Sequence, residues 1–238
     1  IDDNEDSFSV EYLRKIKANH EKWVEEKFNY YLIDLKDELI YINYINEWIY
    51  KADINNWLYW TDDFFLDPFH RIEKKRIKSF FEIEKYIASR IWPKKYPEIE
   101  IAFDNFRMVL KDLYKIYIMW SKERGNEYYQ ERFYKSSYDS EIENIQFIEW
   151  KFHSNLITDL GLELTRAANL ICDKVRQYIS PKFRIEEGHI LVDRDQLYTV
   201  KYKSIDNYYV NLCNFMINRT QRDKAYGQGI HEKYKVFC

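Results

Sequence analysis

Apolar residues recur every three or four positions along the first fifty residues of the chain. From 10 to 31 this spacing is interrupted only at His20, and from 32 to 49 it is repeated. Such a period places the apolar side chains on one face of an α-helix. The pattern predicts a helix over 10–31 and a further helix over 32–49, although the stretch IYINYI is β-branched and aromatic enough to favour a strand.

The segment from 53 to 92 is interpreted as a turn, a loop and a helix. Asp53 can cap a short turn over INNWLYW, and the run TDDFFLDP is interpreted as a loop that ends at Pro68. Apolar residues at helical spacing then predict a helix over 69–91. Pro93 ends this helix, because the residue before a proline disfavours the helical region.

Two long amphipathic patterns follow. The clearest apolar stripe of the chain covers residues 99–120 and closes near Gly125. A second stripe covers residues 140–179 and has Pro181 beyond its end. Both stripes predict helices, with Gly161 as the candidate point at which the second helix kinks or divides.

The pattern changes after Pro181. The short β-rich runs HILV and LYTVKY flank residues 193–196, which predicts a β-hairpin with a four-residue loop within about 181–203. A final helix is expected over 205–218. The whole pattern predicts a mainly α protein, an irregular bundle of about seven helices with a small β-hairpin in its C-terminal third, forming one domain over 1–238.

Composition supports long, rigid elements and a soluble setting. The chain has 22 Tyr, 15 Phe and 7 Trp but only 5 Gly and 4 Pro to interrupt regular structure. Its net charge of -3 gives no overall field for nucleic acid or an anionic membrane. No stretch approaches 18 apolar residues and the acidic opening lacks a secretory signal, so we expect a cytoplasmic protein without a membrane partner. Because the sequence begins with Ile1, a longer parent protein is conceivable.

The reactive residues form no local signature of a cofactor or metal. Cys172, Cys213 and Cys238 are far apart and odd in number, which favours free thiols in a reducing compartment over a disulfide framework. The five histidines are too scattered for a metal motif, and the phosphate-binding glycine loops are absent. The sequence therefore predicts no bound cofactor and no metal.

Two short motifs nevertheless match nucleases. Asp139, followed after ten residues by Glu149 and then Lys151, resembles the PD-(D/E)xK nucleases. In that family an acidic residue and the glutamate of a Glu-x-Lys strand hold a divalent metal, and the lysine positions water. The resemblance implies a strand over 146–152. The same residues also fit a helix, on which Glu149 would lie on an ordinary surface.

Arg14 and His20 provide the second match. An arginine and a histidine at this spacing on one helix of an all-α bundle resemble the motif of HEPN-type ribonucleases. The resemblance implies a metal-independent cleavage of RNA, with the imidazole transferring protons and the guanidinium stabilising the phosphorane. An ordinary exposed helix face is the competing interpretation.

Two polar clusters have both structural and binding interpretations. Arg166, Asn169, Asp173 and Arg176 recur along the helix predicted over 140–179, where they form a salt-bridge ladder or line a cleft. Asn169 lies among apolar residues, so we expect it to be semi-buried and to need a defined partner.

A basic run could bind nucleic acid or an acidic partner, or form a solvated face. This run consists of Arg71, Lys74, Lys75, Arg76 and Lys78.

The aromatic residues are most concentrated between 48 and 65. Trp48, Trp57, Tyr59 and Trp60 exceed what one helix face can bury, so we expect some of these rings to form an interface. Our leading hypothesis is therefore an intracellular helical module that binds a protein partner or itself. The alternatives are the ribonuclease and, next, the metal-dependent nuclease; the sequence identifies no family.

Overall fold

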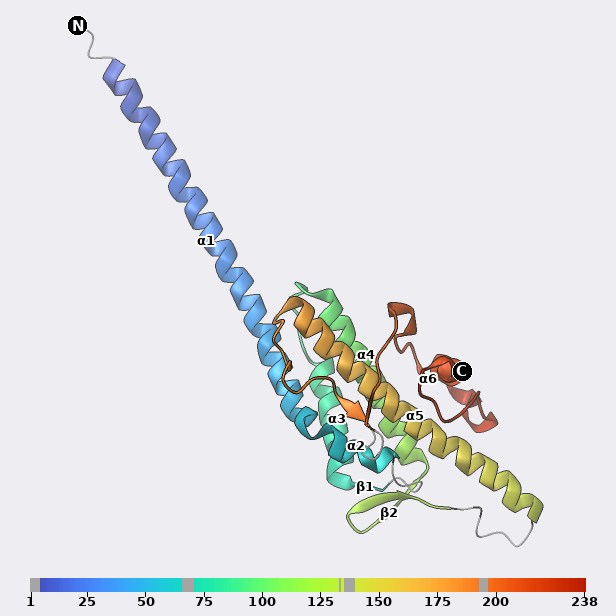
Figure 1. The fold of residues 1–238 in the computed structure, drawn as a ribbon. Helices are drawn as coiled ribbons and strands as arrows, with labels where there is room; N and C mark the ends of the chain where they lie inside the picture. The colour runs from blue at the N-terminus through green and yellow to red at the C-terminus, as the bar shows by residue number, and fades with distance from the viewer. Residues whose placement is uncertain (1–4, 66–70, 133, 135–139, 193–196) are drawn as a thin grey trace. The chain divides into compact units, whose positions relative to one another are not determined.

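A computed structural model describes the chain except for residues 1–4, 66–70, 133, 135–139 and 193–196 (Figure 1). The described residues contain six α-helices and two small antiparallel sheets, which confirms the mainly α prediction. The chain divides into two units, residues 1–44 and 45–238, and each is treated by itself below. The single domain stays a prediction.

All the described residues of the first unit belong to helix α1, Glu5–Lys51, which continues into the second unit. The sequence pattern predicts two successive helical stretches here, and the structure joins them without a break. The reason is local, because no Gly or Pro occurs between residues 5 and 51. The stretch IYINYI is helical as well, so its strand alternative is wrong. At the end of α1, Asp53 adopts a left-handed conformation with φ 53°.

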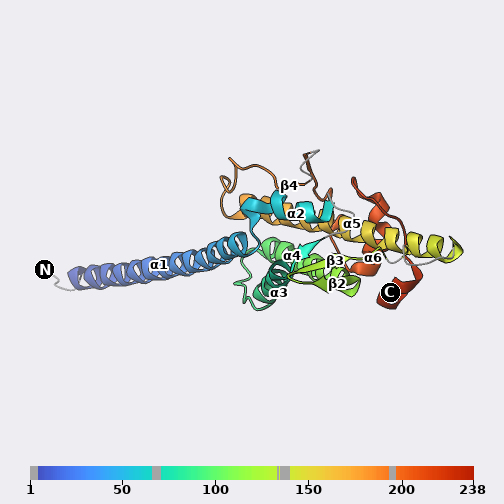
Figure 2. The ribbon, with the colours of Figure 1, turned by 90° about the horizontal axis from the view of Figure 1, so that it is seen from below.

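The second unit is built around two long helices, α4 (Pro97–Met119) and α5 (Ser140–Tyr178), which lie side by side (Figures 1 and 2). Pro97 begins α4 and two glutamates follow in its first turn, which suits a helix N-terminus. Helix α3 (Lys74–Ala88) packs on α4. Helix α5 runs through Gly161 as one continuous element, so the division considered there does not occur.

Three short strands form a sheet that the sequence analysis missed. Its order is β1 (Ile72–Glu73), β3 (Glu127–Gln130) and β2 (Ser121–Arg124), all antiparallel. Arg124 pairs with Glu127 across a two-residue loop. Gly125 opens that loop with φ 60°, a conformation that favours glycine. The Gly125-Asn126 dipeptide was therefore the available signal for the hairpin.

The predicted C-terminal hairpin is present. Strand β4 (Leu191–Val192) pairs with β5 (Tyr198–Thr199), and its loop, 193–196, lies outside the described residues. Val192, Val200 and Leu162 of α5 form a buried cluster. The hairpin is thus attached to the middle of α5 by apolar contacts.

Three predicted boundaries are corrected. Residues 57–65 form helix α2 (Trp57–Phe65), where a loop from Thr61 was expected; the end of that loop, with Pro68, lies outside the described residues. Helix α3 begins at Lys74, because the preceding Ile72 pairs with β3. The final helix α6 covers only Leu212–Asn218. Its start is fixed by the side chain of Asn211, which accepts a hydrogen bond from the Asn214 amide at 2.8 Å.

The cysteine expectation is wrong for two of the three residues. Cys213 and Cys238 form a disulfide, with their Cα atoms 5.1 Å apart, while Cys172 is a buried free thiol. Their separation of 25 residues gave no sign of this proximity, which follows from the path of the chain between them. Within the described residues, no helix combines the length and apolarity needed to cross a bilayer.

Candidate functional site

The tryptophans expected at an interface lie in the core instead. Trp48 is fully buried, with its ring edge-on to Phe103 and Phe106 at centroid distances of 5.5 and 5.6 Å. Trp57 is also buried, and its indole N–H donates to Thr165 Oγ1 at 3.1 Å. Neither ring therefore lies at the surface, and an interface in this segment stays a prediction. Tyr59 is 73% exposed, and the side chain of Trp60 lies outside the described part of the chain.

The exposed apolar residues gather instead on α1. Exposed large side chains, Trp23, Tyr30 and Ile33 among them, occur on several sides of this helix. Six of the exposed apolar residues follow one side, and we call this line the α1 stripe. Their exposed fractions range from 45 to 62%. The α1 stripe consists of Ile16, Val24, Phe28, Tyr31, Leu35 and Leu39. Folded proteins rarely leave a long line of large apolar side chains uncovered, so the α1 stripe is the candidate interaction surface.

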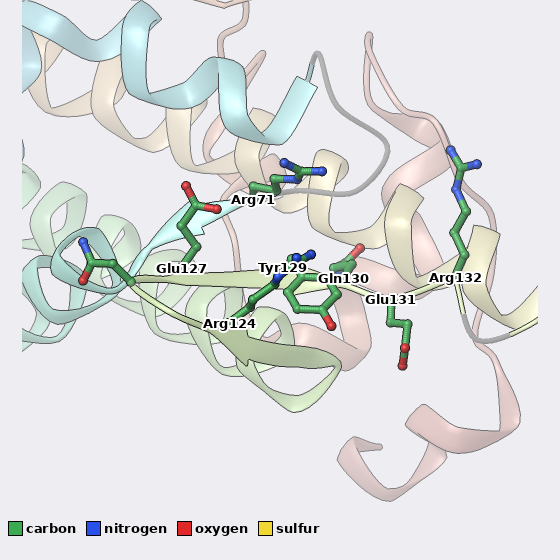
Figure 3. A pocket seen from close by; sticks show the side chains of 8 residues that line it. Arg71, Arg124, Glu127, Tyr129, Gln130, Glu131 and Arg132 are labelled. Atoms are coloured by element: carbon green, nitrogen blue, oxygen red, sulfur yellow. The ribbon is translucent and has the colours of Figure 1, made fainter.

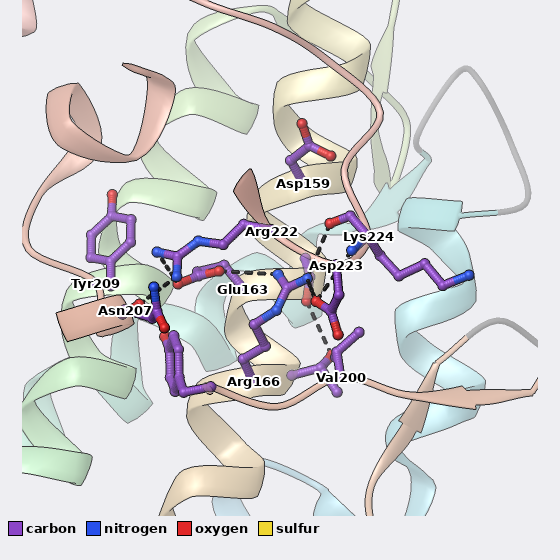
Figure 4. A network of polar contacts seen from close by, with 12 residues as sticks. Asp159, Glu163, Arg166, Val200, Asn207, Tyr209, Arg222, Asp223 and Lys224 are labelled. Carbon is purple, nitrogen blue, oxygen red and sulfur yellow. Dashed lines mark hydrogen bonds and ion pairs between the residues drawn. The ribbon is translucent and has the colours of Figure 1, made fainter. Parts of the chain in front are cut away.

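Helix α5 presents the opposite situation, a polar face that is buried (Figure 4). Arg166 is 1% exposed and donates to Glu163 at 3.1 Å and to Asp223 at 2.8 Å. Arg222 forms an ion pair with the same Glu163 at 3.1 Å. These bonds hold the segment around Asp223 against α5. Because the carboxylates and guanidinium groups compensate one another, the polar face can be buried.

A second buried pair extends this polar face. Asp159 forms an ion pair with Arg219 at 3.2 Å and accepts hydrogen bonds from the amides of Tyr226 and Gly227. Burial raises the pKa of Asp159 to about 6, and these partners only partly oppose the effect. Burial likewise raises the pKa of Glu163.

Asn169 has the defined partner that its sequence position predicted. Its side-chain amide donates to the carbonyls of Ile190 (2.9 Å) and Val200 (3.1 Å), and its oxygen accepts from the Ile190 amide at 2.9 Å. Asn169 is fully buried. Like Arg166, it therefore joins parts of the fold and offers no group to a ligand at the surface.

The hollow next to the buried ion pairs of Arg166 and Arg222 is too small for a substrate. The hollow beside Arg166, Tyr202 and Arg222 has a volume of about 20 Å³, which is enough for roughly one water molecule. The pKa of Asp159 lies in a range useful for proton transfer, but its carboxylate is held by three protein partners. The arrangement is that of a structural clamp.

The residues of the metal-nuclease motif are not arranged as the resemblance requires. Residues 146–152 are helical, as part of α5, so the required strand is absent there. Glu149 is paired with Lys233, Lys151 is exposed, and Asp139 lies outside the described residues. In the described part of the chain, no three His, Cys, Asp or Glu side chains are grouped to hold a metal ion.

Arg14 and His20 are both exposed on α1. A separation of six residues places them about 120° apart around the helix axis, so they do not face one point. The ribonuclease stays a prediction, without a converging site. His153, for which the sequence predicted no role, is buried. The centroids of its ring and of the Trp120 ring are 5.1 Å apart, and its Nδ1 is hydrogen-bonded to the hydroxyl of Tyr234.

The predicted basic patch is largely neutralised. Each of its three lysines forms an ion pair: Lys74 with Glu123, Lys75 with Glu73 and Lys78 with Glu82. Arg71 lines an open pocket of about 760 Å³ with Arg124 and Arg132 (Figure 3). Figure 3 shows Arg132 well apart from the other two, so the three guanidinium groups do not converge. Binding of nucleic acid here stays a prediction.

Comparisons of the chain with protein-family models, with curated proteins and with solved structures find no match.

Proposed function

We propose that the protein is a helical interaction module that associates with a second copy of itself through the α1 stripe. The observation that carries this proposal is the exposure of the α1 stripe on a helix that accounts for all the described residues of its unit. Among the described residues of that unit, α1 has no second element against which to bury such a line. Apolar residues at a spacing of three and four are suited to pack into the grooves of another helix.

The size of the stripe fits a stable complex. Pairing it would bury on the order of 700 Å² per protomer, close to the roughly 800 Å² per partner of a standard interface. Large rings such as Phe28 and Tyr31, 61 and 62% exposed, would supply much of this area. A second copy carries the same stripe over the same length, so it is a matching partner without any further component.

The first prediction tests this proposal in the full chain. Phe28→Lys together with Leu35→Lys places two charges in the α1 stripe, and we expect dimers to be lost over the micromolar range, with Kd raised at least roughly 100-fold. Sedimentation velocity over a concentration series measures this directly.

The matched control adds the same charge on the opposite side of the helix. Asn19 and Asn29 are exposed and lie away from the stripe, so Asn19→Lys with Asn29→Lys should associate as the unsubstituted chain does. A chain that sediments as a monomer at all concentrations, or a control that dissociates equally, would contradict the proposal.

A further inference from the structure

We call the centre line of the α1 stripe its seam. The seam contains two charged residues of opposite sign. At about 100° per residue, Lys17 and Glu38 lie within about 40° of the line through Val24, at the centre of the stripe. Lys17 is near one end of the stripe and its side chain is 78% exposed. Glu38 is near the other end and is partly exposed. Any partner that covers the stripe must therefore accommodate both charges.

The two possible orientations of a helix pair treat these charges differently. Parallel helices in register place Lys17 against Lys17 of the second copy and Glu38 against Glu38, which is repulsive at both ends. Antiparallel helices can place Lys17 against Glu38 twice, when facing residue numbers add up to 55. The two charges therefore favour the antiparallel orientation and the register in which Lys17 faces Glu38.

The same register aligns the other seam residues. It brings Val24 opposite Tyr31, and His20 opposite Leu35. Phe28 comes to lie beside the two-fold axis, next to Phe28 of the second copy. Each of these contacts occurs twice, because the two-fold axis of an antiparallel pair of identical helices relates one to the other.

The wider charge distribution of α1 favours the same orientation. Residues 11–22 carry four basic and two acidic side chains, whereas residues 25–38 carry two basic and five acidic ones. The basic residues are Arg14, Lys15, Lys17 and Lys22, then Lys27 and Lys36; the acidic residues are Glu11 and Glu21, then Glu25, Glu26, Asp34, Asp37 and Glu38. Antiparallel pairing sets the basic half of each helix against the acidic half of the other.

We propose that two copies associate as an antiparallel helix pair of α1, with Lys17 of each copy opposite Glu38 of the other. This inference rests on the proposed function and specifies its partner geometry. The overlap from 17 to 38 spans 22 residues, or roughly 33 Å of helix.

The second prediction is a pair of distances that separates the two orientations. Lys15 and Glu26 both lie away from the seam, so Lys15→Cys and Glu26→Cys, each made singly, accept a spin label without entering the interface. In the antiparallel pair the two labels at 15 are about 40 Å apart and those at 26 about 20 Å apart. In a parallel pair both positions give about 20 Å. Pulsed dipolar spectroscopy on the full chain measures these distances, and the unsubstituted chain, treated with the label, supplies the background from its own cysteines.

A charge exchange gives an independent readout. Lys17→Glu should weaken association roughly 10-fold, because an acidic side chain at position 17 of each copy then faces Glu38 of the other. Adding Glu38→Lys should restore the association. Equal label distances at 15 and 26 in a dimer, or no recovery in the double variant, would overturn the antiparallel geometry alone. A chain that is monomeric throughout would overturn the proposed function as well, so the two failures are distinguishable.

Discussion

The two longest helices of the molecule have opposite surfaces. Helix α1 has 47 residues and exposes an apolar stripe, whereas α5 has 39 residues and buries a polar face. On α5, Arg166, Glu163 and Asp159 are at most 2% exposed, while on α1 Phe28 is 61% exposed. From residue type alone one would expect Phe28 to be buried and the three charged residues of α5 to be exposed. The difference teaches that burial follows the presence of a complementary partner, which α5 finds in the C-terminal segment and which, in our proposal, a second copy supplies to α1.

The largest effect is expected from breaking the clamp on α5. Arg166→Ala removes the cation shared by Glu163 and Asp223 and leaves a buried carboxylate undercompensated, so we expect the free energy of unfolding to fall by about 3–5 kcal/mol. Urea denaturation followed by circular dichroism measures it. Arg176→Ala is the control on the same helix, because its pair with Asp173 is partly exposed; its loss should cost about 1 kcal/mol or less. Equal losses in the free energy of unfolding would show that the buried ion pairs of Arg166 contribute no more than the partly exposed pair of Arg176.

A second effect, about half as large, depends on pH. Because burial raises the pKa of Asp159 from 3.8 to about 6, the native state binds a proton more readily than the unfolded state between these values. The stabilisation from this proton is complete below about pH 4 and is lost as the pH rises through about 6. We expect it to amount to roughly 2–3 kcal/mol.

Denaturation of the unsubstituted chain and of Asp159→Asn between pH 4 and 7.5 isolates this contribution. The variant lacks the titrating group but keeps Glu163, so the difference between the two curves reports Asp159 alone. A difference that does not change with pH would mean that Asp159 is ionised throughout this window.

The smallest effect is expected on α1. Phe28 is 61% exposed, so Phe28→Lys removes little packing within its own unit; at concentrations where the chain is monomeric the free energy of unfolding should change by no more than about 0.5 kcal/mol. Chemical denaturation at nanomolar concentration, followed by tryptophan fluorescence, provides the measurement. A loss comparable to that of Arg166→Ala would remove the contrast between the two helices, because it would show Phe28 to be part of a folded core.

The sequence was informative where a long period determined the element. The stripes at 99–120 and 140–179 predicted α4 and α5 to within a few residues, since an amphipathic pattern of that length has few alternatives. It was uninformative about which faces are covered. Trp48 and Phe28 belong to the same helix and similar patterns, yet one is core and the other exposed, because burial depends on contacts between distant segments.

The polar groups show the same division. Asn169 could be singled out as a buried amide from its apolar neighbours, but its partners, at 21 and 31 residues' distance, could not. The Cys213–Cys238 disulfide and the pairing of Asp159 with Arg219 were missed for the same reason. Local spacing carries no information on contacts that the tertiary path creates.

The bonds of Asn169 have a consequence for the small hairpin of β4 and β5. A two-stranded ribbon is marginal in water, because its outer backbone groups lack the neighbour that a third strand would supply. Asn169 exchanges a donor and an acceptor with the backbone of Ile190, just as a residue in an adjacent strand would, and its second N–H reaches Val200. The Asn169 side chain thus takes the place of one residue of a third strand. Only an amide can do so, because it both donates and accepts a hydrogen bond in the geometry of a peptide group.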